Sequence, residues 1–208
     1  MVIAGAGSGK TRVLTYRIAH LMKQGVDPFS ILSLTFTNKA SREMKARILE
    51  LVGEGEAKNL WMGTFHSIFA RILRQEADKL GFQRDFTIYD TQDSNRLIAA
   101  IIKEMGLDKE IYKFKQIRNR ISSFKNSLIT VKAYLNDPEL QEADAMSRRP
   151  MFGEIYKEYA ERCFKAGAMD FDDLLLKTNE LLNMHPRVLA KYQDRFRYIL
   201  VDLSLIHI

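Results

Sequence analysis

A glycine-rich segment near the start of the chain sets the fold class: Ala4-Gly5-Ala6-Gly7-Ser8-Gly9-Lys10-Thr11. Glycines let the backbone turn with its N–H groups pointing inward, which forms a nest for phosphate oxygens. In such a loop Lys10 bridges the terminal phosphates, the Thr11 hydroxyl ligates Mg²⁺, and the helix that follows adds its positive end. The segment therefore predicts a P-loop fold that binds a nucleotide. We assign nucleotide binding to residues 4–11 and the adjacent Arg12, metal binding to Thr11, and the catalytic contact with phosphate to Lys10.

The loop departs from the usual Gly-x4-Gly-Lys-Ser/Thr pattern at one position, because Ala4 stands where the first glycine is expected. A dinucleotide-binding fingerprint is excluded, because it needs a third glycine where Lys10 stands. A GTPase is also disfavoured. The segment Asn38-Lys39-Ala40-Ser41 has serine where a guanine-reading motif needs aspartate, and it lies too close to the loop.

Strand-like and helix-like segments alternate over residues 1–80. Short apolar runs at residues 2–4, 31–36 and 60–63 predict strands, and helical spacing of apolar residues follows each of them. We expect Asn38 to cap the second helix. This alternation predicts a parallel sheet covered by helices.

The pattern changes after a fourth short strand, which we expect at residues 86–89. From 91 to 165 the apolar residues recur at helical spacing, and strand character returns only at 198–201. We therefore predict an α/β domain in two parts, residues 1–90 and 166–202, interrupted by an all-helical insertion at 91–165. The apolar positions of the insertion are expected to form its core.

The composition excludes several classes of protein. Of the 208 residues, 46% are apolar and 28% are charged, which rules out collagen-like, mucin-like and wholly disordered chains. No apolar run approaches the roughly 18 residues of a membrane-spanning helix. We see no signal peptide, and the single Cys163 fits a reducing, cytosolic setting. The net charge of +6 is a weak indication of nucleic-acid binding.

Both ends of the sequence are unusual. Few residues precede the loop, so we expect the natural chain to begin upstream. Residues 203–208, Leu-Ser-Leu-Ile-His-Ile, continue no recognisable pattern. One reverse translation of them, CTG TCT CTT ATA CAC ATC, is the mosaic-end sequence of a common sequencing transposon. We interpret them as a non-native tail; any other codons in the underlying DNA would contradict this interpretation.

Four further segments accompany the glycine-rich loop in order along the chain. They are Leu34-Thr35-Phe36-Thr37-Asn38-Lys39-Ala40, Gly63-Thr64-Phe65-His66-Ser67, Met169-Asp170-Phe171-Asp172-Asp173-Leu174-Leu175 and Tyr198-Ile199-Leu200-Val201-Asp202. Together with the loop, they resemble the UvrD/Rep/PcrA group of superfamily 1 DNA helicases. That family has alanine at the first loop position, so Ala4 supports the resemblance.

The resemblance implies a RecA-like motor domain that uses ATP and Mg²⁺ to move 3′ to 5′ along single-stranded DNA, toward a single-strand/duplex junction. It implies a cytoplasmic protein of DNA repair or replication. Asp202 matches the carboxylate that holds Mg²⁺ through water. The family places its general-base glutamate next, where this sequence has Leu203. Because leucine cannot accept a proton, and because the sequence lacks the family's adenine-reading segment and second motor domain, we expect this polypeptide to be inactive although its parent is a helicase.

The same resemblance implies where single-stranded DNA binds. It assigns contacts to Phe36, Thr37, Asn38 and Lys39, with the aromatic ring available for base stacking, and to Thr64 and His66. The residues alone leave alternatives open: Phe36 as a core residue, Asn38 as a helix cap, and His66 as a packed, hydrogen-bonded side chain.

Two charged groups in the later sequence also have two interpretations. Six cations occupy an acid-free stretch and either track DNA phosphates or lie on a solvated helix face. They are Lys113, Lys115, Arg118, Arg120, Lys125 and Lys132. Asp170, Asp172 and Asp173 suggest a metal site, but capping of the helix that follows explains them more simply.

Two alternative functions stay open at this point. One is a P-loop phosphotransferase such as a small kinase, although no arginine-rich lid stands out. The other is a non-catalytic module that binds DNA or a partner. DNA-stimulated hydrolysis by the complete gene product would separate the motor from both.

Overall fold

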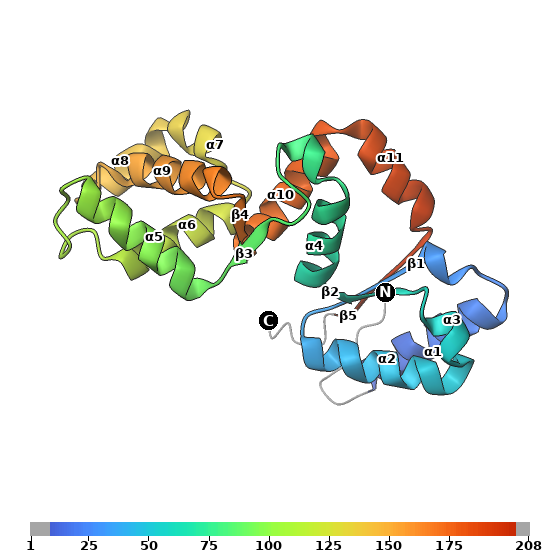
Figure 1. Ribbon diagram of the computed structural model, residues 1–208. Coiled ribbons are helices and arrows are strands. Elements are labelled where there is room, and N and C mark those ends of the chain that lie inside the picture. Colours follow the sequence, from blue (N-terminus) through green and yellow to red (C-terminus); the bar gives the residue numbers. More distant parts are fainter. Residues whose placement is uncertain (1–8, 203–208) are drawn as a thin grey trace. The chain divides into compact units, whose positions relative to one another are not determined.

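The computed structural model describes residues 9–202, which form a helix-rich α/β structure with a small parallel sheet (Figure 1). This part of the chain divides into two units that we describe separately. The first comprises residues 9–71 and 185–202, and the second comprises residues 72–184. The predicted strand at residues 2–4 lies outside the described residues.

Within residues 9–202, the sheet of the first unit has three parallel strands. Its order is β2 (Trp61–Thr64), β1 (Ile31–Thr35) and β5 (Tyr198–Asp202). All five residues of β1 are buried, as expected for the central strand of a parallel sheet with an almost continuous apolar sequence. The strands predicted at 31–36, 60–63 and 198–201 are confirmed within one residue at each end.

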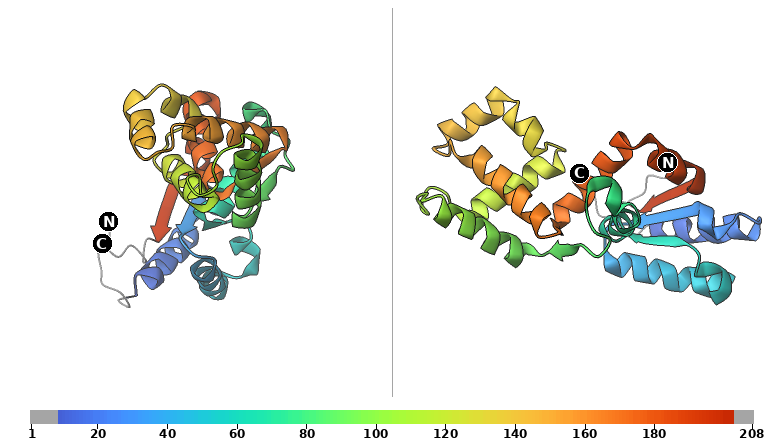
Figure 2. Two further views of the ribbon diagram at one scale, coloured as in Figure 1. Left: turned by 90° about the vertical axis from the view of Figure 1, so that its left-hand side faces the viewer. Right: turned by 45° about the horizontal axis from the view of Figure 1, so that its top comes forward.

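Helices lie on both faces of this sheet. Figure 1 shows α1 (Lys10–Lys23) and α2 (Asn38–Val52) side by side on one face and α11 (Pro186–Arg195) on the other, and the second orientation in Figure 2 agrees. Ile18 from α1 and Met44 and Ile48 from α2 are fully buried together. The short element η1 (Pro28–Ser30) lies between α1 and β1, and α3 (Glu54–Ala57) lies between α2 and β2.

An aromatic cluster packs α11 against the sheet. The Trp61 ring, 1% exposed, meets the rings of Tyr192 and Phe196 edge-on at centroid distances of 6.5 and 5.1 Å. The guanidinium carbons of Arg71 and Arg195 lie 3.8 and 4.5 Å from the Trp61 ring centroid. Cation–π contacts of this kind add to the burial of the ring and hold the arginines over it.

Helix α2 begins one residue differently from the prediction. Thr37, not Asn38, is its N-cap, because the Thr37 hydroxyl oxygen accepts a hydrogen bond of 3.1 Å from the Ala40 N–H. Asn38 is the first helical residue and is exposed. Threonine and asparagine both favour cap positions, so composition alone does not choose between neighbours.

The second unit is mostly helical. After α4 (Phe65–Gln75) and η2 (Ala77–Leu80), the chain forms a helical bundle. Several helices contribute buried residues to its core. The core positions predicted at Ile98, Ile101, Ile117, Ile121 and Tyr159 are all confirmed. The bundle helices are α5 (Thr91–Glu104), α6 (Phe114–Asn126), α7 (Val131–Leu135), α8 (Pro138–Met146), α9 (Phe152–Lys165) and α10 (Phe171–Met184).

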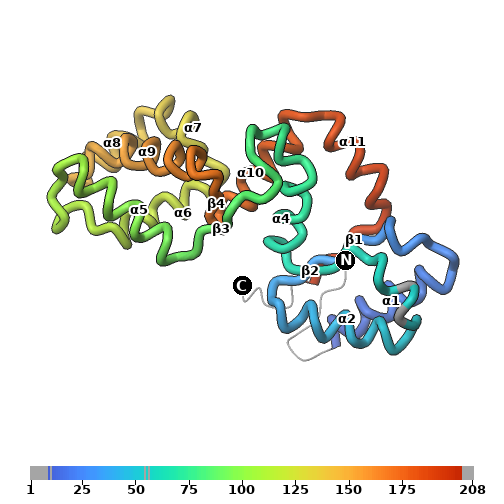
Figure 3. The backbone as a smooth tube through the Cα atoms, in the orientation of Figure 1, coloured from blue at the N-terminus to red at the C-terminus, as the bar shows by residue number. Residues whose placement is uncertain are grey.

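A short strand pair joins the two ends of the bundle. The strand β3 (Thr87–Tyr89) pairs in parallel with β4 (Ala168–Asp170), with Tyr89 opposite Asp170, so the backbone enters and leaves the bundle along adjacent paths (Figure 3). The prediction that strand character returns only at 198 was therefore wrong. Three residues are too few to show an alternating pattern, and β4 depends on a partner far away in the sequence.

A buried cation ties β4 and α10 to the rest of this unit. Lys125 Nζ lies 2.7 Å from Asp170 Oδ2 and 2.8 Å from Asp173 Oδ2, and only 2% of the Lys125 side chain is exposed. Asp170 and Asp173 also cap each other: the Asp173 N–H donates to Asp170 Oδ1 at 2.8 Å, and the Asp170 N–H donates to Asp173 Oδ2 at 3.2 Å. The capping interpretation of these aspartates is confirmed, and a lysine stands where a metal ion was the alternative.

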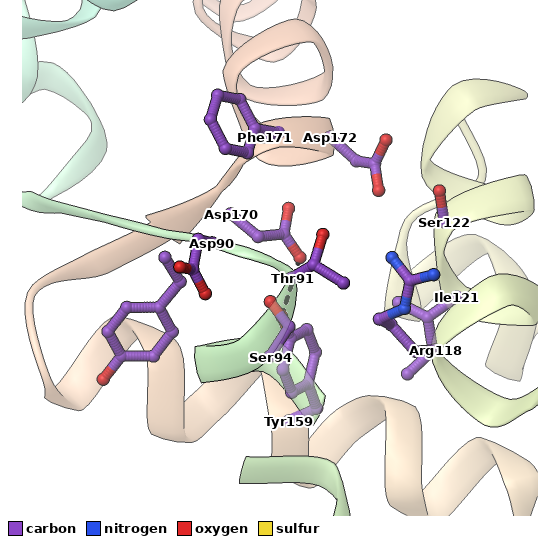
Figure 4. Close-up of a pocket in the computed structure, with 11 residues that line it drawn as sticks. Asp90, Thr91, Ser94, Arg118, Ile121, Ser122, Tyr159, Asp170, Phe171 and Asp172 are labelled. Atoms are coloured by element: carbon purple, nitrogen blue, oxygen red, sulfur yellow. Dashed lines mark hydrogen bonds between the residues drawn. The ribbon is translucent and has the colours of Figure 1, made fainter. Parts of the chain in front are cut away.

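Helix α9 reaches the Asp170 carboxylate directly through a tyrosine hydroxyl, and α5 is connected to it through the same hydroxyl. The Tyr159 hydroxyl from α9 lies 2.8 Å from Asp170 Oδ2 and 2.9 Å from Ser94 Oγ on α5 (Figure 4). A cavity of about 40 Å³ beside these groups has room for about one water molecule. The third aspartate of the segment, Asp172, accepts a hydrogen bond of 2.9 Å from Asn126 Nδ2.

Burial and the neighbouring charges both shift the pKa values of the groups in this cluster. Burial by itself opposes the charge on Lys125, but the attraction of Asp173 and Asp170 outweighs it and raises the pKa of the lysine. Burial likewise opposes the charge on Asp170, and the adjacent ammonium holds the pKa of that carboxyl below its usual value. The charged pair is therefore the stable state of the folded protein at neutral pH.

We predict that Lys125→Met destabilises the protein by about 3–5 kcal/mol, because it leaves two buried carboxylates without their cation. Urea unfolding at pH 7 measures the change. Lys132→Met is the matched control, since Lys132 is exposed, and it should change the free energy of unfolding by no more than about 0.5 kcal/mol. Equal effects of the two variants would contradict a structural role for the cluster.

We also predict that the difference between the wild type and Lys125→Met shrinks as the pH falls from 7 to 3. The folded pKa of Asp170 is lowered, so the stability it contributes is present above the unfolded value of about 3.9 and is lost as the pH falls through the folded pKa. In the variant, protonation instead relieves the buried carboxylates. Unfolding curves of both proteins across this range test the prediction, and a pH-independent difference would argue against it.

Candidate functional site

The described part of the glycine-rich loop is its end. Gly9 is the N-cap of α1 and has a left-handed backbone, with φ +84°. A Cβ at Gly9 would meet no atom within 4 Å, so glycine is required there by conformation and not by space. Ala4, Gly5, Ala6, Gly7 and Ser8 lie outside the described residues. Lys10 begins α1, and its side chain likewise falls outside the described part.

The first turn of α1 contacts the end of β5. The Thr11 hydroxyl donates a hydrogen bond of 2.7 Å to Asp202 Oδ2, and Asp202 is only 5% exposed. The backbone of Thr11 is in turn held by the buried Thr15, whose hydroxyl donates to the Thr11 carbonyl oxygen at 2.8 Å. Two residues assigned to one metal site, 191 positions apart in sequence, thus lie side by side.

The strand register aligns three polar residues at the carboxyl edge of the sheet. Thr35 at the end of β1 is opposite both Thr64 of β2 and Asp202 of β5. Ligands of open parallel sheets bind at this edge, beyond the ends of the strands. The segments assigned to DNA begin at the end of β2 and directly after β1, so they start from the same row as Asp202, the carboxylate assigned to the metal.

The segment after β1 is exposed. Phe36 has 69% of its surface exposed, and Asn38 and Lys39 are exposed as well. The alternative of Phe36 as a core residue is therefore wrong, and so is the alternative of Asn38 as the cap. Thr37 differs from its neighbours, because its hydroxyl is engaged in capping α2. An exposed ring on a rigid strand-to-helix turn is available for stacking against a flat ligand.

The segment after β2 is more tightly packed. The Thr64 hydroxyl oxygen accepts from the Ser67 N–H at 3.3 Å, and the Ser67 hydroxyl donates to the Thr64 carbonyl oxygen at 2.9 Å. A Cβ on Gly63, in β2, would meet Ser67 Oγ, so a larger residue there would require the Ser67 side chain to move. His66, at the start of α4, is half-buried.

Arg12 lies beside a cavity that the sequence did not indicate. The Arg12 guanidinium carbon is 5.6 Å from the Tyr16 ring centroid, one helical turn further along α1. Both residues line a cavity of about 310 Å³ with Thr15, Arg47, Glu50 and Leu51. The four-residue spacing of Arg12 and Tyr16 was a usable signal. Arg47 comes from α2 and could be found only from the packing of the two helices.

The residues present fit a magnesium ion. Thr11 and Asp202 supply hydroxyl and carboxylate oxygens, which Mg²⁺ prefers, and proteins usually hold this ion through one or two side chains together with substrate phosphates and water. No group of three or more histidine, cysteine, aspartate or glutamate residues within 9–202 is arranged to hold a metal by itself.

The six cations of the insertion do not form one phosphate-binding track. Lys125 is buried in the ion cluster, and Arg120 Nε lies 3.3 Å from the buried Asp144. Lys113 is exposed and lies 3.7 Å from Glu110. The prediction treated every cation in an acid-free stretch as free, but acids from distant segments fold back onto two of them.

No helix of the described residues has the length and apolar character to cross a membrane.

Comparison with known proteins places these observations in a family. The family model described as the UvrD/REP helicase N-terminal domain matches residues 1–202. An ATP-dependent DNA helicase PcrA of Staphylococcus epidermidis is 44% identical over 203 residues, and one of Staphylococcus aureus is 42% identical over 203 residues. Each alignment covers 97% of this chain but only 27% of the relative, so the chain spans about a quarter of the length of these curated relatives.

Proposed function

Because this chain belongs to the UvrD/REP helicase N-terminal domain family, we propose that it is the nucleotide-binding part of an ATP-dependent DNA helicase. The observation that carries the proposal is the contact between Thr11 Oγ1 and Asp202 Oδ2, which brings the two nucleotide motifs together. The sheet is then one part of a RecA-like motor domain. We also propose that the motor domain is formed by residues 1–90 and 166–202, and that the helical insertion occupies residues 91–165.

The nucleotide site assigns separate tasks to these side chains. Backbone N–H groups at residues 5–9 and the Lys10 ammonium bind phosphate oxygens, and the start of α1 adds its positive end. Thr11 ligates Mg²⁺ and Asp202 holds the water around it. The ion, when bound, neutralises charge on the phosphates. Arg12 and Tyr16 line the adjacent cavity, which is open to the remainder of a nucleotide.

The DNA site begins from the same row of strand ends. Phe36 presents its ring for base stacking, and Asn38, Lys39, Thr64 and His66 contact the backbone of a single strand. Stacking is independent of base identity, which suits a protein that moves along DNA of any sequence. Travel from 3′ to 5′, action at a single-strand/duplex junction, a role in DNA repair or replication and a cytoplasmic location complete the proposal.

Hydrolysis depends on a residue that this sequence does not supply. The family places a glutamate after the aspartate of the second nucleotide motif, whereas Leu203, outside the described residues, follows Asp202 here. Loss of a positioned base costs about 10²- to 10⁴-fold in rate. We therefore propose that the chain as given binds nucleotide and DNA with negligible turnover.

We predict that Thr11→Val and Asp202→Asn each remove the Mg²⁺ dependence of ATP binding. Loss of an outer-shell metal partner such as Asp202 costs about 10- to 100-fold in metal affinity, and loss of a direct ligand costs at least as much. Fluorescence titration with a labelled ATP analogue, with Mg²⁺ and with EDTA, measures the effect. Phosphate release in the same samples should stay at background.

Thr87→Val is the matched control for this experiment. Thr87 is exposed in β3 of the other unit and has no assigned contact with nucleotide, so its replacement should leave the titration unchanged. Mg²⁺-dependent binding that survives in Thr11→Val and Asp202→Asn would refute the proposed nucleotide site. DNA-stimulated phosphate release by the unmodified chain would refute its inactivity.

We predict that Phe36→Ala weakens binding of a short oligothymidylate by about 5- to 150-fold, because stacking on one base is worth about 1–3 kcal/mol. The free energy of unfolding should change by no more than about 0.5 kcal/mol, since the ring is 69% exposed. Fluorescence anisotropy and urea unfolding measure the two quantities. Phe29→Ala removes another exposed ring, 46% exposed, and should leave oligonucleotide binding intact. Unchanged binding by Phe36→Ala would exclude the stacking role.

A further inference from the structure

The second unit has an apolar groove between α5 and the segment that leads into α6. Its volume is about 880 Å³. The floor comes from Ala99, Ala100 and Ile102 on α5 and from the buried Tyr112, and Phe114 at the start of α6, 37% exposed, forms part of the wall. The residues assigned above to nucleotide and DNA all belong to the first unit, so this groove lies outside that assignment.

The rim of the groove is strongly basic. Four lysines line it, and Glu110 is its one acidic residue. Lys113 Nζ lies 3.7 Å from Glu110, which partly offsets a single charge. The ammonium groups of Lys103, Lys109 and Lys115 have no ion pair within the described residues, and all three side chains are exposed.

We propose that this groove docks an acidic amphipathic segment of a partner protein. The apolar side chains of the segment enter the groove over Ala99, Ala100 and Ile102 and pack against Phe114. Its aspartate and glutamate side chains meet the lysine rim. Helical segments that insert an apolar face into a groove are a recurring mode of recognition, and complementary charge at the rim sets partner choice and association rate.

The lining favours a protein segment over nucleic acid. Single-stranded nucleic acids bind to platforms of successive exposed aromatic rings, whereas Tyr112 is 6% exposed and Phe114 is the only other ring in this lining. The lysines of the rim can pair with phosphates as well as with carboxylates, so the apolar lining and the small number of exposed rings, not the charge, favour a protein segment. Exposed apolar side chains of the lining, such as Phe114, instead gain free energy when an apolar partner buries them.

The experiment uses the full chain and a fluorescein-labelled helical peptide of about 16 residues, with leucine and phenylalanine on one face and glutamate elsewhere. Fluorescence anisotropy measures its affinity. The test variant is Lys109→Glu with Lys115→Glu. The matched control is Lys132→Glu with Lys157→Glu, which changes the net charge equally at exposed lysines that line a different groove of the same unit. Lys115 is the second residue of α6, where glutamate favours the helix, so the fold is retained.

We expect the test variant to weaken peptide binding by about 10-fold or more and the control to change it by less than about 2-fold. Phe114→Ala, which alters no charge, should also weaken binding. A peptide with serine in place of its apolar residues should not bind.

Four results would overturn the proposal. They are no binding of the peptide, equal losses in the two charge variants, unchanged affinity in Phe114→Ala, and binding of the serine peptide as tightly as the apolar one. A further pair of results would also overturn the proposal and would identify the groove as a nucleic-acid surface. Oligothymidylate would displace the peptide, and its own binding would be weakened in the variant Lys109→Glu with Lys115→Glu.

Discussion

The register of one buried strand determines most of the first unit. Thr35 ends β1 opposite both Thr64 and Asp202, so the three strands stop at one line. Because side chains alternate between faces, a slip of one residue in β5 would move the Asp202 carboxylate to the opposite face and away from Thr11. The hydrogen bond between Thr11 and Asp202 therefore reports the register of the sheet as well as the geometry of the proposed metal site.

The second unit meets a different constraint, because it must return the chain close to where it entered. The parallel pair of β3 and β4 does this through only three residues on each strand. Such a short pair is weak by itself, and the buried cluster of Lys125, Asp170 and Asp173 adds charge-assisted hydrogen bonds at its end. A buried ion pair often adds little net stability compared with an apolar core, but loss of one partner is costly. The cluster thus fixes where β4 ends and α10 begins.

Sequence reasoning found the parts of this structure whose signals are local. Helical spacing located Ile98, Ile117 and Tyr159 in the core, and the apolar run at 31–36 located the central strand. It failed where a distant partner decides the outcome. The strand at 168–170 is too short to show a pattern, and the role of Lys125 depends on aspartates 45 and 48 residues away that the fold brings beneath it. Thr15 and Arg47, beside the proposed nucleotide site, could be identified only from the packing of α1 against α2.

The exposure of Phe36 connects these constraints to the proposed motor. Phe36 has 69% of its surface in water and directly follows a fully buried strand, so the ring is not part of the core. The preceding residue, Thr35, lies in register with Asp202, so strand pairing connects the turn that carries the ring to the carboxylate assigned to the nucleotide site. In the proposed motor, two hydrogen-bonded neighbouring strands would carry the carboxylate assigned to Mg²⁺ and the ring assigned to DNA, which gives nucleotide state and DNA contact a short physical connection.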